Sequence, residues 1–433
     1  MSPYLPTAPY RGTRDFLPGE MSIREQVFDK LYEVIEGYGY QRYDGPILES
    51  AEIYEAKTSR EIVEQQIYTL TDRGGRRLAL RPEMTPSVAR MIAGNAGRLQ
   101  FPVRWYTHVN CHRYERPQRG RVREHWQINV DIFGTESLNA EIEIFSLIHD
   151  LMASTGAGRE TYVLRANDRI LLESMLTDII RVPADRTREV ASLIDRWEKY
   201  DRAALLAEGL EAGLTEAQFE HLEKTLQSGE ELLAELPAEV RERSPLVAIL
   251  ESDARELVTF DPLIVRGFEY YTSTVFEVFD RDPANRRSLF GGGRYDNLAG
   301  LFSSQRIPGI GFGMGDVTLF DFLETHNLLP EPRSEADVVV IPLDAELAGA
   351  AREVAGRLRE GGRRTVVPFE PRKLGKEIAR ADKSGAKAVV IIGASGWAEG
   401  NVTIRRLADG SQEDVPAAEV AGRLTELLES PPA

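Results

Sequence analysis

The chain has very little cysteine: Cys111 is the only one in 433 residues. A single thiol excludes an internal disulfide and is typical of proteins from a reducing compartment. Apolar runs are short as well, and none approaches the roughly 18 residues that a membrane-spanning helix needs. The N-terminal stretch MSPYLPTAPYRGTRDFLPGE is polar and proline-rich, without the apolar core of a signal peptide. We therefore expect a cytoplasmic protein with no membrane segment.

Histidine is also scarce, and the six histidines and one cysteine show no metal-ligand spacing. His108 and His112 are four residues apart, but their neighbours have the character of a strand, on which the two rings would not share a helical face. No zinc or other protein-held metal site is expected.

Positive charge is in deficit, with 53 Lys and Arg against 69 Asp and Glu and a formal net charge of −16. This excludes indiscriminate nucleic-acid binding but leaves room for a local basic surface. The composition, 42% hydrophobic and 28% charged, is that of a folded globular protein. The length predicts two or three domains.

The first half of the chain changes from helical to strand character. Residues 21–40 carry apolar side chains at helical spacing and end in Gly37 and Gly39, which predicts an amphipathic helix. The segments RRLALRP, FPVRWYTHVNCHRYE and HWQINVDIFG, between residues 41 and 133, predict a largely antiparallel sheet. Residues 139–155 return to helical spacing.

The remainder predicts an inserted helical block and a separate end domain. We expect an α/β protein in which an α+β main domain (1–169 and 256–325) is interrupted by a helical insertion (170–255). A polar, proline-containing linker (326–335) then leads to a C-terminal α/β domain (336–430) with a mostly parallel sheet.

The densest positive charge lies in RYERPQRGRVREHWQ, where five arginines fall within residues 113–123. Pro117 and Gly120 predict a turn between two strands. Arginines at such a tip can hold a polyphosphate or a nucleic-acid end. A solvated hairpin paired with the acidic surplus is the alternative, although five close cations repel one another unless an anion lies among them.

The stretch LALRPEMTPSVAR places Glu83 and Thr85 after a strand and near Arg81. A carboxylate there could receive an α-amino group. Glu83 could equally cap the helix whose start Thr85 and Pro86 indicate.

In VRGFEYYTSTVFEVF, Tyr270 and Tyr271 are adjacent, so on a strand they would face opposite ways, one into the core and one towards a pocket. Arg266 precedes them and suggests an anion partner or a salt bridge at the strand edge. The glycines of GGGRYD (291–296) and GIGFGMGD (309–316) indicate close approach of a ligand or of another backbone segment, or a tight turn in the first case.

Taken in order, RGTRDFLP, LRPEMT, RYERPQRGRVREHWQ, VRGFEYYTSTVFE, GGGRYD and GFGMG resemble the histidyl-tRNA synthetases, a family of class II aminoacyl-tRNA synthetases. The resemblance covers nearly the whole chain, including the helical insertion and an anticodon-binding α/β domain. It implies activation of L-histidine with ATP and Mg2+, transfer to tRNA(His), and a homodimer formed through the first long helix and the strand after it.

The resemblance also implies roles for individual residues. Arg113 would bind the α-phosphate of ATP, with Glu115 and His125 on the adenine side and Arg121 and Arg123 towards the outer phosphates. Arg266 would face Arg113 and stabilise charge at the α-phosphorus. Gln118 and Arg119 would approach the tRNA end. The α-amino group of L-histidine would meet Glu83, Thr85 and Gln127, and its imidazole would meet Asp131, Tyr271 and Tyr295. Tyr270 is a further expected substrate-binding residue.

Three positions depart from the family pattern. Thr318 stands where the glycine-rich third motif normally ends in an arginine that holds the γ-phosphate, and Asp316 adds a negative charge nearby. His125 replaces an aromatic ring, and Asp131 is shorter than the usual glutamate. These departures keep two alternatives open: a histidine-sensing regulatory subunit of ATP phosphoribosyltransferase, and a divergent paralogue that adenylates or binds an amino acid for another purpose.

The C-terminal domain carries a local excess of positive charge, with nine Lys or Arg against four Asp or Glu in residues 359–387. This surface suits tRNA phosphates, or it is a charged helix face.

Overall fold

The computed structural model describes residues 4–55, 66–265, 270–370 and 373–429, which divide into two compact units. The first unit comprises the described residues up to Phe16 and from Arg24 to Pro330. The second comprises those from Glu331 onward together with Leu17–Ile23. The predicted linker, 326–335, spans the boundary between them.

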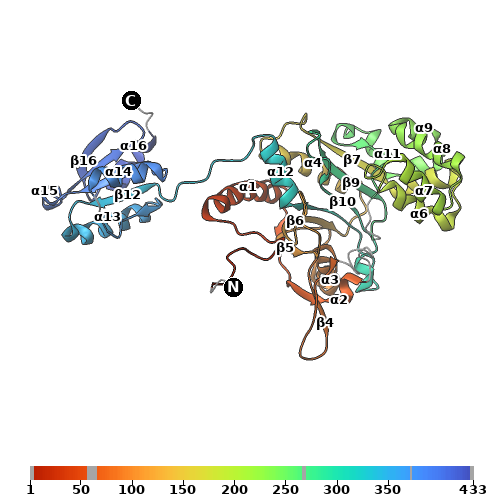
Figure 1. Ribbon diagram of the computed structural model, residues 1–433, viewed down its shortest axis with the longest axis horizontal. Helices are drawn as coiled ribbons and strands as arrows, with labels where there is room; N and C mark the ends of the chain where they lie inside the picture. Colours follow the sequence, from red (N-terminus) through yellow and green to blue (C-terminus); the bar gives the residue numbers. More distant parts are fainter. Residues whose placement is uncertain (1–3, 56–65, 266–269, 371–372, 430–433) are drawn as a thin grey trace. The chain divides into compact units, whose positions relative to one another are not determined.

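In the described part of the first unit, eight strands form one sheet in the order β1-β5-β6-β11-β10-β9-β7-β8 (Figure 1). Their bounds are β1 (Gln41–Arg42), β5 (Val103–His112), β6 (Glu124–Phe133), β7 (Tyr162–Asp168), β8 (Thr259–Phe260), β9 (Thr274–Asp280), β10 (Ser288–Arg294) and β11 (Gly309–Gly315). The central strands pair antiparallel, as predicted, and the edge strands β1 and β8 pair parallel. A smaller sheet joins β2 (Leu48–Ser50), β4 (Arg77–Leu80) and β3 (Thr69–Thr71) in that order.

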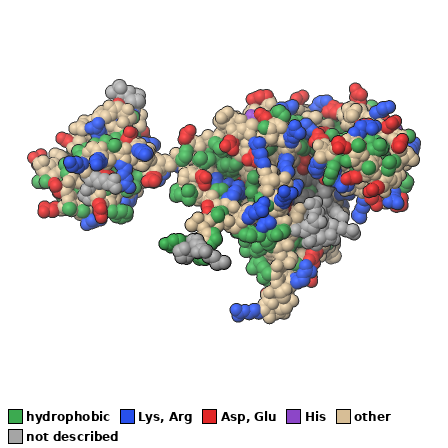
Figure 2. Space-filling view, in the orientation of Figure 1, with side chains coloured by type: hydrophobic (Ala, Val, Ile, Leu, Met, Phe, Trp, Pro, Cys, Tyr) green, Lys and Arg blue, Asp and Glu red, His purple; other side chains and the backbone are tan. Residues whose placement is uncertain are grey.

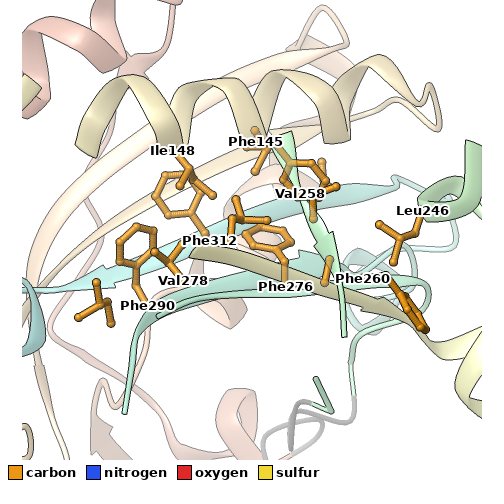
Figure 3. Close-up of a cluster of buried hydrophobic side chains, with 14 of the residues drawn as sticks. Phe145, Ile148, Leu246, Val258, Phe260, Phe276, Val278, Phe290 and Phe312 are labelled. Carbon is orange, nitrogen blue, oxygen red and sulfur yellow. The ribbon is translucent and has the colours of Figure 1, made fainter. Parts of the chain in front are cut away.

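One face of the large sheet is covered by apolar helical faces. The predicted first helix is α1 (Pro18–Gly37); it buries Val27, Leu31 and Ile35 at helical spacing and ends at Gly37. Helix α4 (Asn139–Ser154) directs Phe145 and Ile148 at side chains of β9, β10 and β11 (Figure 3). The rings of Phe145 and Phe276 lie 5.2 Å apart, nearly perpendicular. Burial of each such ring stabilises the folded state by roughly 1.5–3 kcal/mol.

Short helices connect the strands and form the insertion between β7 and β8, drawn in yellow-green at one end of this unit (Figure 1). The insertion consists of α5 (Arg169–Ser174), the π-helical η3 (Met175–Ile179), η4 (Ala184–Arg186), α6 (Thr187–Ile194), α7 (Arg202–Glu211), α8 (Glu216–Gln227), η5 (Gly229–Glu231), α9 (Leu232–Glu235), α10 (Ala238–Arg243), α11 (Pro245–Leu250) and η6 (Arg255–Leu257). Elsewhere lie α2 (Ala51–Glu55), α3 (Thr85–Asn95), η2 (Ala96–Arg98), η7 (Ala299–Leu301) and α12 (Asp316–Thr325).

The second unit has its own sheet, ordered β13-β12-β14-β15-β16, and its own core. The strands are β12 (Val338–Pro342), β13 (Thr365–Val366), β14 (Ala388–Ile392), β15 (Asn401–Arg406) and β16 (Gln412–Pro416); the helices are η8 (Ala345–Leu347), α13 (Ala348–Glu360), α14 (Leu374–Lys383), α15 (Ala394–Ala398) and α16 (Val420–Glu429).

The prediction of a mostly parallel sheet in this unit is wrong. Strand β12 pairs parallel with β13 and β14, but β14, β15 and β16 run antiparallel because residues 401–416 form a hairpin whose turn holds Gly410 at φ 73°. The α/β class itself is confirmed. No helix in the described ranges combines the length and apolarity that crossing a membrane requires.

Candidate active site

The polar side chains of the site stand on the central strand β6. Gln127, Asn129 and Asp131 alternate with Ile128, Val130 and Ile132, which pack into the core, so the three polar groups share the opposite face of the sheet. The strand places its amide and carboxyl groups in one row. The row needs open space above it to serve as a binding surface.

The neighbouring strand β11 provides that space through its glycines. Gly311 pairs with Asp131 and Gly313 with Asn129. A Cβ on Gly311 would collide with the Asp131 carboxylate and the Val130 carbonyl, and one on Gly313 would collide with the Gln127 amide. The stretch GIGFGMGD therefore forms a strand that packs closely against β6 and is followed by the helix α12.

A cavity of about 310 Å3 opens over this row. Nine of the predicted site residues line it: Glu83, Thr85, Arg113, Arg121, Gln127, Asp131, Tyr270, Tyr271 and Tyr295. They come from segments that are far apart in the sequence, and the fold brings them to one place. The sequence prediction missed three polar lining residues: Asn129, Glu277 and Ser288. Alternation along β6 from Gln127 to Asp131 could have indicated Asn129.

A buried carboxyl group that lines the cavity has one oxygen without a hydrogen-bond partner among the described residues. Asp131 Oδ1 accepts a hydrogen bond from the Tyr295 hydroxyl, whereas Oδ2 is buried and has no hydrogen-bond partner among the described residues. Burial raises the pKa of Asp131 to about 7, and the Tyr295 hydrogen bond opposes this rise. A buried acceptor without a donor is costly, so this end of the cavity fits a ligand that brings an N–H group.

At the other side, Glu83 is buried and accepts a hydrogen bond of 3.0 Å from the Tyr270 hydroxyl. Glu83 does not cap the following helix: α3 starts after Met84, without a side-chain cap. Gln127 Nε2 donates to Asn129 Oδ1 at 2.9 Å. A carboxylate and an amide thus border the cavity, a pairing that suits an ammonium group.

The prediction that Tyr270 and Tyr271 face opposite ways is wrong. Both precede β9, outside any strand, and both are buried and line the cavity, with ring centroids 4.8 Å apart. The period-two rule holds only within a strand. The alternative of a tight turn at GGGRYD is also wrong, because these glycines lie within β10, where a Cβ on Gly292 would collide with the Gly311 carbonyl.

The arginine-rich loop is the connection between β5 and β6. Gln118 and Arg121 exchange backbone hydrogen bonds, and Gly120 between them adopts φ 74°, which favours glycine. Arg113 is held by the Pro82 carbonyl at 2.9 Å, and Arg121 pairs with Glu115 at 3.3 Å. Figure 2 shows Lys and Arg side chains gathered across the middle of this unit.

Three residues predicted on the nucleotide side do not line the cavity: Glu115, Arg123 and His125. Arg123 lies over the Tyr114 ring at 4.2 Å and donates to the Tyr10 hydroxyl and the Glu115 carbonyl, so it holds the loop. Burial, and then the charge of Arg113, lower the pKa of His125 to about 3. This ring is therefore neutral at neutral pH. Arg266 lies outside the described residues.

Asp316 does not add an unbalanced negative charge. Its carboxylate pairs with Arg14 at 2.9 Å and Arg24 at 2.8 Å, and it accepts the Trp126 backbone N–H at 3.0 Å. Thr318 donates a hydrogen bond to the Leu289 carbonyl. Arg294, the arginine of the GGGRYD stretch, has a structural partner: it forms a buried ion pair with Glu141 of α4 at 2.6 Å.

A second cavity, of about 650 Å3, adjoins the first and shares Arg121, Glu277 and Ser288 with it. Its lining contains several cations, among them Arg286 and Arg287. A ligand that fills the first cavity can extend into the second past Arg121. The combined space suits an amino acid next to a polyphosphate.

Comparison with known proteins agrees with this geometry. A family model described as "Histidyl-tRNA synthetase" matches residues 12–317, and one described as "Anticodon binding domain" matches residues 337–427. A histidine–tRNA ligase of Leptospira biflexa is 38% identical over 430 residues, which cover 98% of each chain. The corresponding ligase of Pyrococcus horikoshii is 34% identical over 431 residues, covering 96% of this chain and 98% of its own. The crystal structure of histidyl-tRNA synthetase from Nostoc sp. PCC 7120 has a TM-score of 0.81 at 26% identity and covers 98% of this chain and all of its own. With matches along nearly its entire length and a cavity built from the motifs of this family, the chain belongs to the histidyl-tRNA synthetases, class II aminoacyl-tRNA synthetases.

Proposed function

We propose that the protein activates L-histidine with ATP to form histidyl-adenylate and then transfers the histidyl group to the 3′ end of tRNA(His). The observation that carries this proposal is Asp131, which lines the cavity and whose Oδ2 has no hydrogen-bond partner among the residues that the structure describes. An imidazole N–H supplies the missing donor, whereas apolar and acidic side chains do not. A site that must satisfy a buried polar group discriminates strongly against ligands that leave it unpaired.

The amino acid is oriented by the groups at the two ends of the first cavity. Asp131 and Tyr295, with Tyr271, bind the imidazole. Glu83, Thr85 and Gln127 receive the α-amino group, and Tyr270 fixes the Glu83 carboxylate through its hydroxyl. The carboxylate of L-histidine then points to the side of the cavity that Arg113 lines.

Adenylation is an in-line displacement at phosphorus. A carboxylate oxygen of L-histidine attacks the α-phosphorus, the bond to the pyrophosphate oxygen breaks, and pyrophosphate leaves. Arg113 stabilises the charge on the α-phosphate, and Arg266, which the resemblance places opposite, does the same from the other side. Glu115 and His125 remain proposed on the adenine side. Arg121 reaches towards the outer phosphates, whereas Arg123 acts by holding the loop.

Mg2+ accompanies ATP in this proposal. The described residues contain no cluster of three or more His, Cys, Asp or Glu that could hold a metal ion. The acidic Glu277 lines both cavities where the phosphates would pass. Mg2+ suits this setting because it binds through phosphates and water with only one or two carboxylates, and it neutralises phosphate charge.

The tRNA completes the reaction. A terminal ribose hydroxyl attacks the carbonyl carbon of the adenylate, and AMP leaves. Gln118 and Arg119 at the tip of the arginine loop approach the acceptor end, and the basic surface of the second unit binds the anticodon arm. We place the reaction in the cytoplasm.

A homodimer is also part of the proposal, formed through α1 and the strand after it. The small sheet, which follows β1 in the chain, exposes the apolar side chains of Ile47, Leu48 and Leu70, which a partner chain would cover. Analytical ultracentrifugation tests this: a sedimenting mass near twice the 48.5 kDa of one chain is expected, and a mass of 48.5 kDa contradicts it.

The alternative of a histidine-sensing regulatory subunit of ATP phosphoribosyltransferase is not favoured. The chain matches the anticodon-binding domain model over residues 337–427, and its curated relatives, from bacteria to archaea, are histidine–tRNA ligases. Charging of tRNA(His) with radiolabelled L-histidine tests the proposal directly. Histidyl-tRNA that forms only with ATP present supports it. Histidine binding without any charging favours the regulatory alternative.

A further inference from the structure

Arg287 lies beside the position at which the family pattern would place the missing arginine. Thr318, which occupies that position, is in the first turn of α12, and Arg287 immediately precedes β10. The Thr318 hydroxyl donates to the Leu289 carbonyl, so the two segments are in direct contact. Arg287 and Thr318 are thus far apart in the sequence but lie close together in space.

The tip of the arginine loop meets both residues. A Cβ placed on Gly120 would lie 3.5 Å from Arg287 Cδ and 3.7 Å from Thr318 Cγ2. The same three residues, Gly120, Arg287 and Thr318, line both the 650 Å3 cavity and a smaller one of about 180 Å3 next to it. The Arg287 side chain therefore lies in the path of a ligand that passes Arg121.

The charges around Arg287 favour a bound anion. Arg287 is exposed and makes no hydrogen bond or ion pair with the described residues. Partial burial lowers the pKa of Arg287, the charge of Arg121 lowers it further, and Glu115 opposes both effects. Glu115 already pairs with Arg121 at 3.3 Å. Two guanidinium groups thus lie within electrostatic range of one carboxylate, which pairs with Arg121, and a bound phosphate would stabilise this arrangement.

Several other cations around these cavities have partners. In the second cavity, Arg165 pairs with Asp261 at 3.0 Å and Lys199 pairs with Asp195 at 3.1 Å. Arg119, which lines the smaller cavity, donates to Asn285 at 3.0 Å. Arg286 also lines the cavity, but it does not approach Gly120 within 4 Å of that Cβ position. Arg286 is therefore a matched control: the same residue type and charge, one position away.

We propose that Arg287 binds the terminal phosphates of ATP and takes the place of the arginine that is absent at position 318. This inference rests on the proposed adenylation. The short Thr318 side chain leaves room for the Arg287 guanidinium, and an arginine at both positions would bring like charges together. The phosphate clamp would then consist of Arg121 from the loop and Arg287 from the segment just before β10.

The test is ATP–pyrophosphate exchange by the full chain at saturating L-histidine, without tRNA, in wild type, Arg287→Ala and Arg286→Ala. Loss of one charge-assisted phosphate contact should raise the KM for ATP about ten- to a hundred-fold in Arg287→Ala, with the KM for L-histidine within about two-fold of wild type. Arg286→Ala should stay within about two-fold for both substrates. Adding Thr318→Arg to Arg287→Ala should recover at least about five-fold in the KM for ATP.

Several results would overturn the inference: an unchanged KM for ATP in Arg287→Ala, an equal rise in Arg286→Ala, no recovery in the double variant, or an effect confined to the KM for tRNA in charging assays. Absence of exchange in wild type would instead refute adenylation. ATP affinity measured by calorimetry on wild type and Arg287→Ala would then decide the role of Arg287. Should the alanine variant unfold, Arg287→Gln repeats the test with a shorter polar side chain that carries no charge.

Discussion

The two oxygens of the Asp131 carboxyl group lie in different environments. Its Oδ1 accepts a hydrogen bond from Tyr295, and its Oδ2 is buried without a hydrogen-bond partner among the described residues, in surroundings that raise the pKa to about 7. Such a group is stable only at a cost to the free protein, and the cost is relieved when a ligand brings an N–H or a positive charge. Strain of this kind belongs to function more often than to folding.

The pH dependence of stability follows from that pKa. An unfolded aspartate titrates near 3.8, so between that value and about 7 the native state keeps a proton that the unfolded chain has lost. The free energy of unfolding therefore falls as pH rises through this window and no longer depends on Asp131 above it. Asp131→Asn removes the titration, and its stability relative to wild type should grow with pH, by at most about 4 kcal/mol. Urea unfolding at several pH values from about 4.5 to 7.5 measures the difference; a difference that does not change with pH would contradict the buried carboxyl.

At this scale the sequence succeeded where residues belong to a continuous motif. Glu83, Gln127 and Asp131 were assigned by resemblance, and the structure brings them to one cavity. Tyr270 was misjudged because the strand begins only at Thr274. Arg287 could not be predicted, since its significance arises from contact with Gly120 and Thr318, which are distant in the sequence.

Among the elements, the pairing of β10 with β11 forms the floor of the site. Gly292 pairs with Phe312, and a methyl group on Gly292 would collide with the backbone of Gly311 and Phe312. The sequence identified these glycines as sites of close approach, but it could not say whether a ligand or another strand approaches, because pairing partners are set by the whole sheet.

Gly292→Ala tests this packing. Its Cβ would collide with the Gly311 carbonyl and lie 2.7 Å from Phe312 Cα, and backbone atoms of a central strand cannot move aside. We expect a loss of about 1–3 kcal/mol or more in the free energy of unfolding. Gly94→Ala in α3, where a Cβ meets nothing within 4 Å, is the control; it should be neutral or stabilising by up to about 1 kcal/mol. Equal stability of the two variants would show that the close approach is not rigid.

For the whole molecule, we propose that the first unit carries out adenylation and that the second binds the anticodon arm. The second unit has an independent core, and its helix α14 presents Lys376, Arg380 and Lys383 to solvent around the buried Glu377. The excess of Lys and Arg in residues 359–387 predicted a basic surface here, but composition could not show that half of the sheet in this unit is antiparallel.

Charge reversal on α14, with Lys376→Glu and Arg380→Glu together, should raise the KM for tRNA in charging about ten-fold or more, because phosphate contacts dominate nucleic-acid affinity. ATP–pyrophosphate exchange without tRNA should be unchanged. The same double reversal on α13, Arg352→Glu and Arg357→Glu, controls for net charge alone. A similar rise in both variants would mean that the effect is a general field and not a binding face.

The central claim is that this cavity activates L-histidine. The most direct test is ATP–pyrophosphate exchange with each of the standard amino acids in turn, with Arg266→Ala as the control for the chemical step. Exchange should occur with L-histidine alone and fall by about a hundred-fold or more in the variant, as expected for loss of one group that stabilises transition-state charge. No exchange with L-histidine, although calorimetry shows that it binds, would contradict the claim: the pocket would then recognise the amino acid without activating it.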